Sequence, residues 1–162
     1  MFVFFIVVGG CGYHLRESRS AFRDMPGLFI EVVRNETAEV GIEKLFTESI
    51  YKEFIKSKSV NIVKKDNSEI ILHTTIKNYS VAPIFFNPSG FPIQYRVNVD
   101  IHSVLRSKTG DLLWDSELLH DANEYFVPEN VLDIKRDEWR AVKHLSDNIA
   151  EEIYDMLLES FE

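Results

Sequence analysis

The sequence contains a single cysteine, Cys11, among 162 residues, so no disulfide bond can form within the chain. Basic residues are not in excess, because 18 Lys and Arg stand against 26 Asp and Glu, which gives a net charge of -8. Proteins that bind nucleic acids need clustered cations to neutralise phosphates, so this balance argues against a nucleic-acid partner. The apolar run from Met1 to Val8 is too short for a transmembrane helix, which needs about 20 apolar residues.

The sequence also lacks the spacing patterns of metal sites and of common hydrolases. Its histidines have no cysteine or helical glutamate at ligand spacing; they are His14, His73, His102, His120 and His144. No glycine-flanked nucleophile turn is present, and Gly9 and Gly10 precede a cysteine and do not form a phosphate loop. We therefore expect no metal, no cofactor and no enzymatic activity.

The overall composition is that of one folded domain, since 45% of the residues are apolar and 27% are charged. The charges are unevenly distributed. From Val60 to Gly110 the chain carries six basic and three acidic residues, whereas every other part is neutral or acidic. This middle segment is where an anionic ligand would be tolerated, although scattered solvating charge explains the same pattern.

The N-terminus has the pattern of a bacterial lipoprotein signal. The apolar run ends in the small residues Gly9 and Gly10, directly before Cys11. A cysteine that becomes the new N-terminus after cleavage can be acylated on its thiol and its amine. We expect residues 1–10 to be a signal peptide, Cys11 to be lipidated and residues 11–27 to be a tether. No Lys or Arg precedes the run, so we expect the true start to lie upstream.

Two segments have the apolar spacing of amphipathic helices, and several others have that of strands. Apolar residues recur every three or four positions in Val40 to Ser57 and in Ile134 to Phe161. Strands are predicted in the remaining β-rich segments: Leu28 to Val33, Val60 to Val63, Glu69 to Val81, Ile93 to Arg106 and Leu112 to Phe126. The first of these is almost wholly apolar, which is typical of an interior strand.

The turn Asn87-Pro88-Ser89-Gly90 predicts a hairpin in which Ile76 pairs with Ile101 and Lys77 with Asp100. In this register one face of the hairpin is apolar and the other polar. The predicted fold is therefore α+β, a two-layer sandwich with two amphipathic helices on one face of a mostly antiparallel four- to five-stranded sheet. Residues 28–162 would form this single domain, and the other face of its sheet would be open.

Several motifs resemble the LptE family. They are GCGYHLR at Gly10 to Arg16, IKNYSVAP at Ile76 to Pro83, Tyr95 to Val97, and KTGDLLW at Lys108 to Trp114. The likeness extends from Cys11 to the final helix. Two features depart from the family pattern: the missing basic residues before the signal run, and the aromatic segment Ile84 to Phe86 before the turn.

The resemblance implies an outer-membrane lipoprotein that sits inside an LptD-like barrel, supports its assembly and contacts lipopolysaccharide without catalysing a reaction. On the positive segment, Arg96 and Lys77 are candidate ligands of lipopolysaccharide phosphates, because a guanidinium can form two hydrogen bonds to a phosphate. For Lys77 a plain cross-strand pair with Asp100 is the simpler interpretation. The alternative function is a periplasmic auxiliary lipoprotein or a glycolipid carrier of another lipid-transport system, and a carrier would enclose an apolar cavity.

Overall fold

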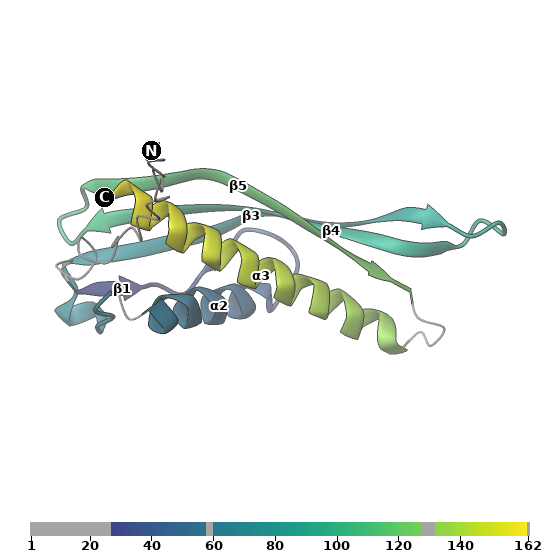
Figure 1. Ribbon diagram of the computed structural model, residues 1–162, viewed down its shortest axis with the longest axis horizontal. Coiled ribbons are helices and arrows are strands. Elements are labelled where there is room, and N and C mark those ends of the chain that lie inside the picture. The colour runs from purple at the N-terminus through teal and green to yellow at the C-terminus, as the bar shows by residue number, and fades with distance from the viewer. Residues whose placement is uncertain (1–26, 58–59, 128–131, 162) are drawn as a thin grey trace, which may run out of the picture.

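The computed structural model describes residues 27–57, 60–127 and 132–161, and they form a sheet covered on one face by two helices (Figure 1). The strands are β1 (Leu28–Ile30), β2 (Arg34–Asn35), β3 (Ile70–Phe86), β4 (Pro92–Ser107) and β5 (Leu112–Phe126). The helices are α2 (Ile42–Ser57) and α3 (Leu132–Ser160), and a short 3-10 turn, η1 (Lys65–Asn67), precedes β3. The predicted α+β fold class is confirmed.

The sheet has five strands in the order β1-β3-β4-β5, with β2 also paired to β3. The strands β3, β4 and β5 form an antiparallel meander, whereas β1 and β2 run parallel to β3. The prediction of an interior first strand was wrong, because β1 lies at the edge and Val32, just beyond it, is 68% exposed. The segment predicted as a strand at Val60 to Val63 contributes only a bridge between Ile62 and Leu28.

The hydrophobic core lies between the helices and one face of the sheet. The two helices and the long strands contribute side chains at helical or alternating spacing; the largest fully buried ones include Phe46, Ile50, Phe54, Leu72, Ile76, Ile101, Leu105, Leu145 and Ile149. The ring of Phe54 on α2 meets that of Tyr154 on α3 edge to face, with centroids 5.3 Å apart. Within the described ranges, neither helix is long and apolar enough to cross a bilayer.

The register of β3 and β4 follows the prediction up to Ile76, which pairs with Ile101. One residue later the register shifts, and Asn78 in place of Lys77 lies opposite Asp100. The predicted Lys77–Asp100 pair is therefore wrong. An extra residue in one strand is a β-bulge, and it reverses which alternate residues face the core. Beyond it, Tyr79 and Val81 point to the helix side, where Tyr79 donates a hydrogen bond to Oε1 of Glu138 on α3 (2.8 Å).

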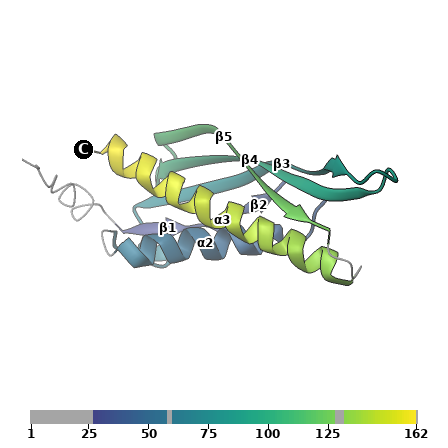
Figure 2. The same cartoon turned by 45° about the vertical axis from the view of Figure 1, so that its right-hand side comes forward.

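The outer part of the β3–β4 hairpin runs past the ends of both helices (Figures 1 and 2). Its turn is the predicted one at Asn87 to Gly90, and Gly90 takes the left-handed conformation with a φ of 81°. The described domain starts at the opposite end, where Leu28 on β1 pairs with Ile70 at the beginning of β3. The start of the domain and the hairpin tip are therefore separated by the length of β3.

The two helices are joined by a polar contact in addition to their apolar faces. Buried Ser49 on α2 hydrogen bonds to Ser146 on α3 (2.8 Å) and donates to Oδ1 of Asp147 (2.9 Å). Lys143 also donates to this oxygen, at 2.5 Å. Burial alone would raise the pKa of Asp147, but the hydrogen bonds from Lys143 and Ser49 outweigh it and lower the pKa below its ordinary value of 3.8.

The face assignment is tested by placing a carboxylate on each side of β3. Ile76→Asp should lower the free energy of unfolding by more than about 3 kcal/mol, because the wild-type side chain is 0% exposed and the new charge would have no partner. Ser80→Asp, on the open face of the same strand, should change it by less than about 0.5 kcal/mol. Chemical denaturation measures both values, and similar losses at the two positions would contradict the assignment.

The lowered pKa of Asp147 predicts a pH-dependent contribution to stability. A carboxylate whose pKa is lower in the folded state stabilises that state at neutral pH, and the effect is lost as the pH falls through the folded pKa. Asp147→Asn should therefore be less stable than the wild type above pH ~5, and the difference should shrink below 3.8. Denaturation curves between pH 7 and about 3 measure this trend.

Glu152→Gln is the matched control, because Glu152 lies five residues further along α3 and makes no hydrogen bond or ion pair in the described parts of the chain. Its stability difference from the wild type should be small at every pH. A difference for Asp147→Asn that stayed constant with pH would show that packing, and not charge, accounts for the effect.

Candidate functional site

The open face of the sheet is the surface that the helices leave free, and its charged residues are mostly paired. Three histidines lie beside carboxylates: His73 Nδ1 is 2.6 Å from Glu31, His102 Nε2 is 2.7 Å from Asp115, and His120 Nδ1 is 2.6 Å from Asp100. The hydrogen bond to His102 lowers the pKa of Asp115, followed by that from the backbone N–H of Glu117. The ionised form of Asp115 is thus favoured beside His102.

Arg96 is one of the two predicted phosphate ligands, and it lies on this face with its side chain 48% exposed. Its Nε (3.1 Å) and Nη2 (2.7 Å) donate to Oε1 of Glu124, which faces it from β5. The second carboxylate oxygen of Glu124 accepts a hydrogen bond from Gln94 at 2.6 Å. Only Nη1 of the guanidinium has no partner among the described residues, so a phosphate could bind there or displace Glu124.

Lys77 is the other predicted ligand, and it lies at the bulge of β3, away from Arg96. Its Nζ donates to Oε2 of Glu36, 3.0 Å away, in the segment that follows β2. Arg96 lies opposite Ala82, five residues further along β3 than Lys77, which corresponds to about 16 Å. The two predicted ligands therefore do not form one compact site.

The open face carries a further cation that sequence reasoning missed. Arg34 on β2 pairs in register with Thr75 and contributes to a hollow of about 530 Å³ together with His73 and Arg106. Arg106 donates from Nη1 to the carbonyl oxygen of Gly110 (2.9 Å), whereas the side chain of Arg34 has no partner in the described ranges. The only signal in the sequence was the position of Arg34 directly after the predicted first strand.

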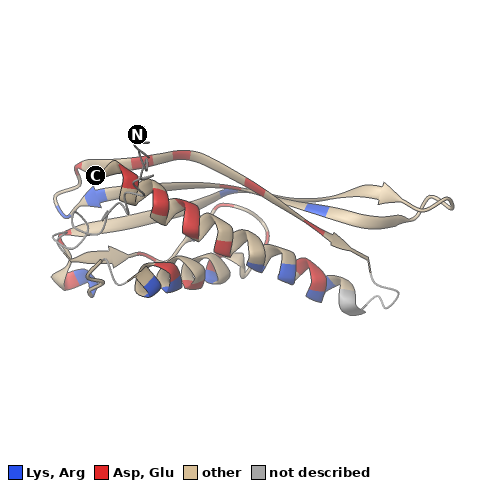
Figure 3. Cartoon of the chain, in the orientation of Figure 1, with Lys and Arg blue, Asp and Glu red and all other residues tan. Residues whose placement is uncertain are grey.

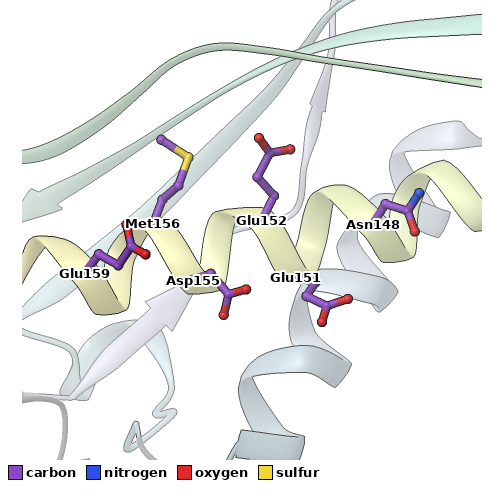
Figure 4. A pocket seen from close by; sticks show the side chains of 6 residues that line it. All are labelled: Asn148, Glu151, Glu152, Asp155, Met156 and Glu159. Atoms are coloured by element: carbon purple, nitrogen blue, oxygen red, sulfur yellow. The ribbon is translucent and has the colours of Figure 1, made fainter. Parts of the chain in front are cut away.

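The outer surface of α3 has the opposite character. A hollow of about 330 Å³ on this helix is lined by Asn148, Glu151, Glu152, Asp155, Met156 and Glu159. In Figure 4, Glu151 and Asp155 project to one side of the helix and Glu152 to the other. No Lys or Arg follows Lys143 in the sequence, so this surface disfavours an anionic ligand (Figure 3). In the described parts of the chain, no three His, Cys, Asp or Glu residues are placed to hold a metal ion.

The lipidation site predicted at Cys11 lies outside the described residues, as do the predicted signal peptide and almost all of the tether. The structure therefore describes the open face of the sheet and not the predicted membrane anchor.

Comparisons with known proteins place the fold among bacterial lipoproteins. The rare lipoprotein B of Shewanella oneidensis is 14% identical, with a TM-score of 0.57 over 82% of this chain and 95% of that one. A putative lipoprotein of Caulobacter crescentus is 9% identical, with a TM-score of 0.61 over 88% and 93% of the two chains. An uncharacterized lipoprotein B of Nitrosomonas europaea is 14% identical, with a TM-score of 0.56 over 88% and 87%. These identities establish similarity of fold alone.

No curated protein sequence gives a match. The family model described as LptE, lipopolysaccharide-assembly, matches residues 25–157, which include every strand and most of α3. Because this match covers most of the sequence and the fold agrees with that of the solved lipoproteins, the chain belongs to the LptE family of lipopolysaccharide-assembly lipoproteins.

Proposed function

We propose that this protein is a lipid-anchored subunit of the outer-membrane lipopolysaccharide translocon, that it occupies and supports an LptD-like barrel, and that it contacts lipopolysaccharide. The family match over residues 25–157 is the observation that carries the proposal. The role is one of binding and structural support, without catalysis. Residues 28–162 act as its single domain, after a signal peptide at 1–10 and a tether at 11–27.

The packing of the core favours a subunit that uses its outer surfaces over a carrier that encloses its ligand. The space between sheet and helices is filled by large side chains at 0–1% exposure, among them Phe46, Phe54 and Leu105. An acyl chain inside this layer would have to displace them, at a cost comparable to disrupting the core. A ligand or barrel is therefore met by the open face and by the exposed ends of the strands.

We assign the lipopolysaccharide contact to Arg96 on the open face of β4 and to Lys77 at the bulge of β3. Each is bound to one glutamate, Glu124 for Arg96 and Glu36 for Lys77. Exposed ion pairs of this kind contribute only about 0–1 kcal/mol, so a phosphate that carries more charge can compete for the cation. Arg96 is the stronger of the two, because its planar guanidinium can meet two phosphate oxygens.

The anchor is assigned to Cys11. A bilayer holds a multiply acylated chain firmly, since each buried methylene contributes about 0.8 kcal/mol. Gly12 stands where an aspartate would favour retention in the inner membrane, which fits onward sorting to the outer membrane.

The anchor assignment predicts that the mature protein begins at Cys11 and carries two or three acyl chains. Intact-mass analysis of the protein purified from membranes should show this added mass, and Cys11→Ala should give an uncleaved or soluble product. A wild-type protein that carries no lipid on Cys11 would overturn both the anchor and the outer-membrane location.

The proposed function predicts that the full chain copurifies with a large outer-membrane β-barrel and binds lipopolysaccharide. Arg96→Glu should still fold and still copurify with the barrel, but it should bind lipopolysaccharide more weakly at low salt, with the difference shrinking at high salt as charges are screened. Equilibrium binding at two salt concentrations measures the effect.

Glu124→Gln is the matched variant, because it removes the charge that competes for Arg96 and keeps the side-chain size. It should bind lipopolysaccharide at least as tightly as the wild type. Unchanged binding by both variants at both salt concentrations would remove Arg96 from the site, and failure of the wild type to copurify with a barrel would sink the proposed function.

A further inference from the structure

The tip of the β3–β4 hairpin exposes a cluster of apolar side chains. They are Phe85 (60% exposed), Phe86 (55%), Phe91 (67%) and Ile93 (40%) on the hairpin, and Phe126 (68%) at the end of the neighbouring β5. Single exposed apolar residues are common on protein surfaces, but a gathering of four aromatic rings and an isoleucine at one end of a sheet marks a binding surface. The hairpin extends beyond both helices (Figure 2), whereas Phe126 on β5 lines a hollow together with Asp137 and Arg140 of α3.

The tip also lacks charge. No Asp, Glu, Lys, Arg or His occurs between Lys77 and Arg96, and in Figure 3 the outer part of the hairpin carries no charged residue. In a chain of net charge -8 with 27% charged residues, this segment is distinct from the rest of the surface. An uncharged apolar surface is complementary to a hydrocarbon and not to a polar or ionic partner.

The backbone N–H groups of the turn are satisfied internally. Asn87 N–H donates to the carbonyl oxygen of Phe91 (2.8 Å), and Gly90 N–H donates to that of Asn87 (2.9 Å). The side-chain Oδ1 of Asn87 accepts from the N–H groups of Ser89 (3.0 Å) and Phe91 (2.9 Å).

The two prolines of the turn, Pro88 and Pro92, have no N–H group. Every backbone donor from Asn87 to Pro92 is therefore either bonded within the turn or absent. Because no donor is left unpaired, the cost of bringing this turn into contact with hydrocarbon is lowered.

The apolar surface continues directly into the proposed phosphate site. Gln94 on β4 lies opposite Phe85 on β3 and opposite Phe126 on β5, and directly opposed residues point to the same face of a sheet. Gln94 and Arg96 are two residues apart on one strand, so they also share a face. The cross-strand row Phe85–Gln94–Phe126 thus lies about 7 Å along the strands from the row that contains Arg96, on the same open face.

We propose that this row and the hairpin tip bind the acyl chains of lipopolysaccharide while Arg96 contacts a phosphate of the same molecule. The inference rests on the proposed function and adds the hydrocarbon half of the site. A phosphorylated glycolipid carries phosphate groups next to its acyl chains. The open face offers a matching arrangement, with the cation Arg96 next to the apolar row. The aromatic rings supply large contact areas, and the turn presents them without exposing unpaired backbone donors.

The test uses the full chain with Cys11→Ala, so that no acyl chain of its own can occupy the tip. Two probes are compared: lipopolysaccharide, and the phosphorylated oligosaccharide that remains when its acyl chains are removed. Phe85→Gln/Phe126→Gln should weaken binding of intact lipopolysaccharide by about tenfold or more and leave binding of the deacylated probe unchanged. Arg96→Glu should weaken binding of both probes.

Tyr51→Gln/Ile55→Gln is the matched control, because it replaces two similarly exposed apolar side chains on α2, at 42% and 53% exposure. It should bind both probes as the starting protein does, and all variants should keep the same thermal midpoint. Unchanged binding of intact lipopolysaccharide by the Phe85 and Phe126 variant, with Arg96→Glu still weaker, overturns the acyl-chain site and leaves the proposed function standing. If the starting protein binds neither probe, the proposed lipopolysaccharide contact itself fails.

Two further outcomes would assign the tip to another occupant and so overturn the proposal. One is loss of barrel copurification in the Phe85 and Phe126 variant without loss of lipopolysaccharide binding, which would indicate a protein contact. The other is equally strong, tip-dependent binding to vesicles of phosphatidylethanolamine, which would indicate insertion into a bilayer.

Discussion

The pairing of β3 with β4 is the constraint on which the rest of the molecule depends. These strands have 17 and 16 residues, whereas strands of about five or six residues are usual. Their inner halves form the apolar sheet surface on which both helices pack. Ile76 and Ile101, directly opposed and fully buried, fix the register at the centre of this sheet surface. Because the side-chain period of a strand is two, a slip of one residue would turn the core face to solvent. The outer halves of β3 and β4 continue the antiparallel pairing beyond the ends of the helices.

The bulge at Lys77 divides the hairpin into these two halves. Before it, Leu72 and Ile76 face the core, and after it Tyr79 and Val81 take that side. The inner half is held by apolar packing against α2 and α3. The outer half is held by tyrosines: the rings of Tyr95 and Tyr125 stack with centroids 5.6 Å apart, and Tyr79 donates to Glu138. Burial and the neighbouring Glu138 raise the pKa of Tyr79, which keeps its hydroxyl a donor.

Much of this fold could be predicted from the sequence, because the period of β4 and the apolar stripes of the helices are local signals. The bulge was missed, although the sequence carries a trace of it: the core-facing residues are even-numbered at Leu72 and Ile76 but odd-numbered at Tyr79 and Val81. The edge position of β1 could not be inferred, since an apolar run does not say which strand lies beside it. The same limit applies to Arg96 and Lys77, whose partners come from β5 and from the segment after β2.

The anchor proposed at Cys11 precedes the end of the sheet that is remote from the hairpin tip. β3 has 17 residues, so it spans about 55 Å, more than the ~30 Å hydrocarbon core of a bilayer. Leu28 begins the domain beside Ile70, at the end of β3 remote from the turn. The proposed tether, residues 11–27, also has 17 residues, and an extended chain reaches about 3.3–3.6 Å per residue, so its reach is comparable to the length of β3. The position of the anchor therefore does not decide what occupies the tip, and the chemistry of the surface decides it: an uncharged apolar row beside the cation Arg96 matches a lipid that carries phosphate next to its acyl chains.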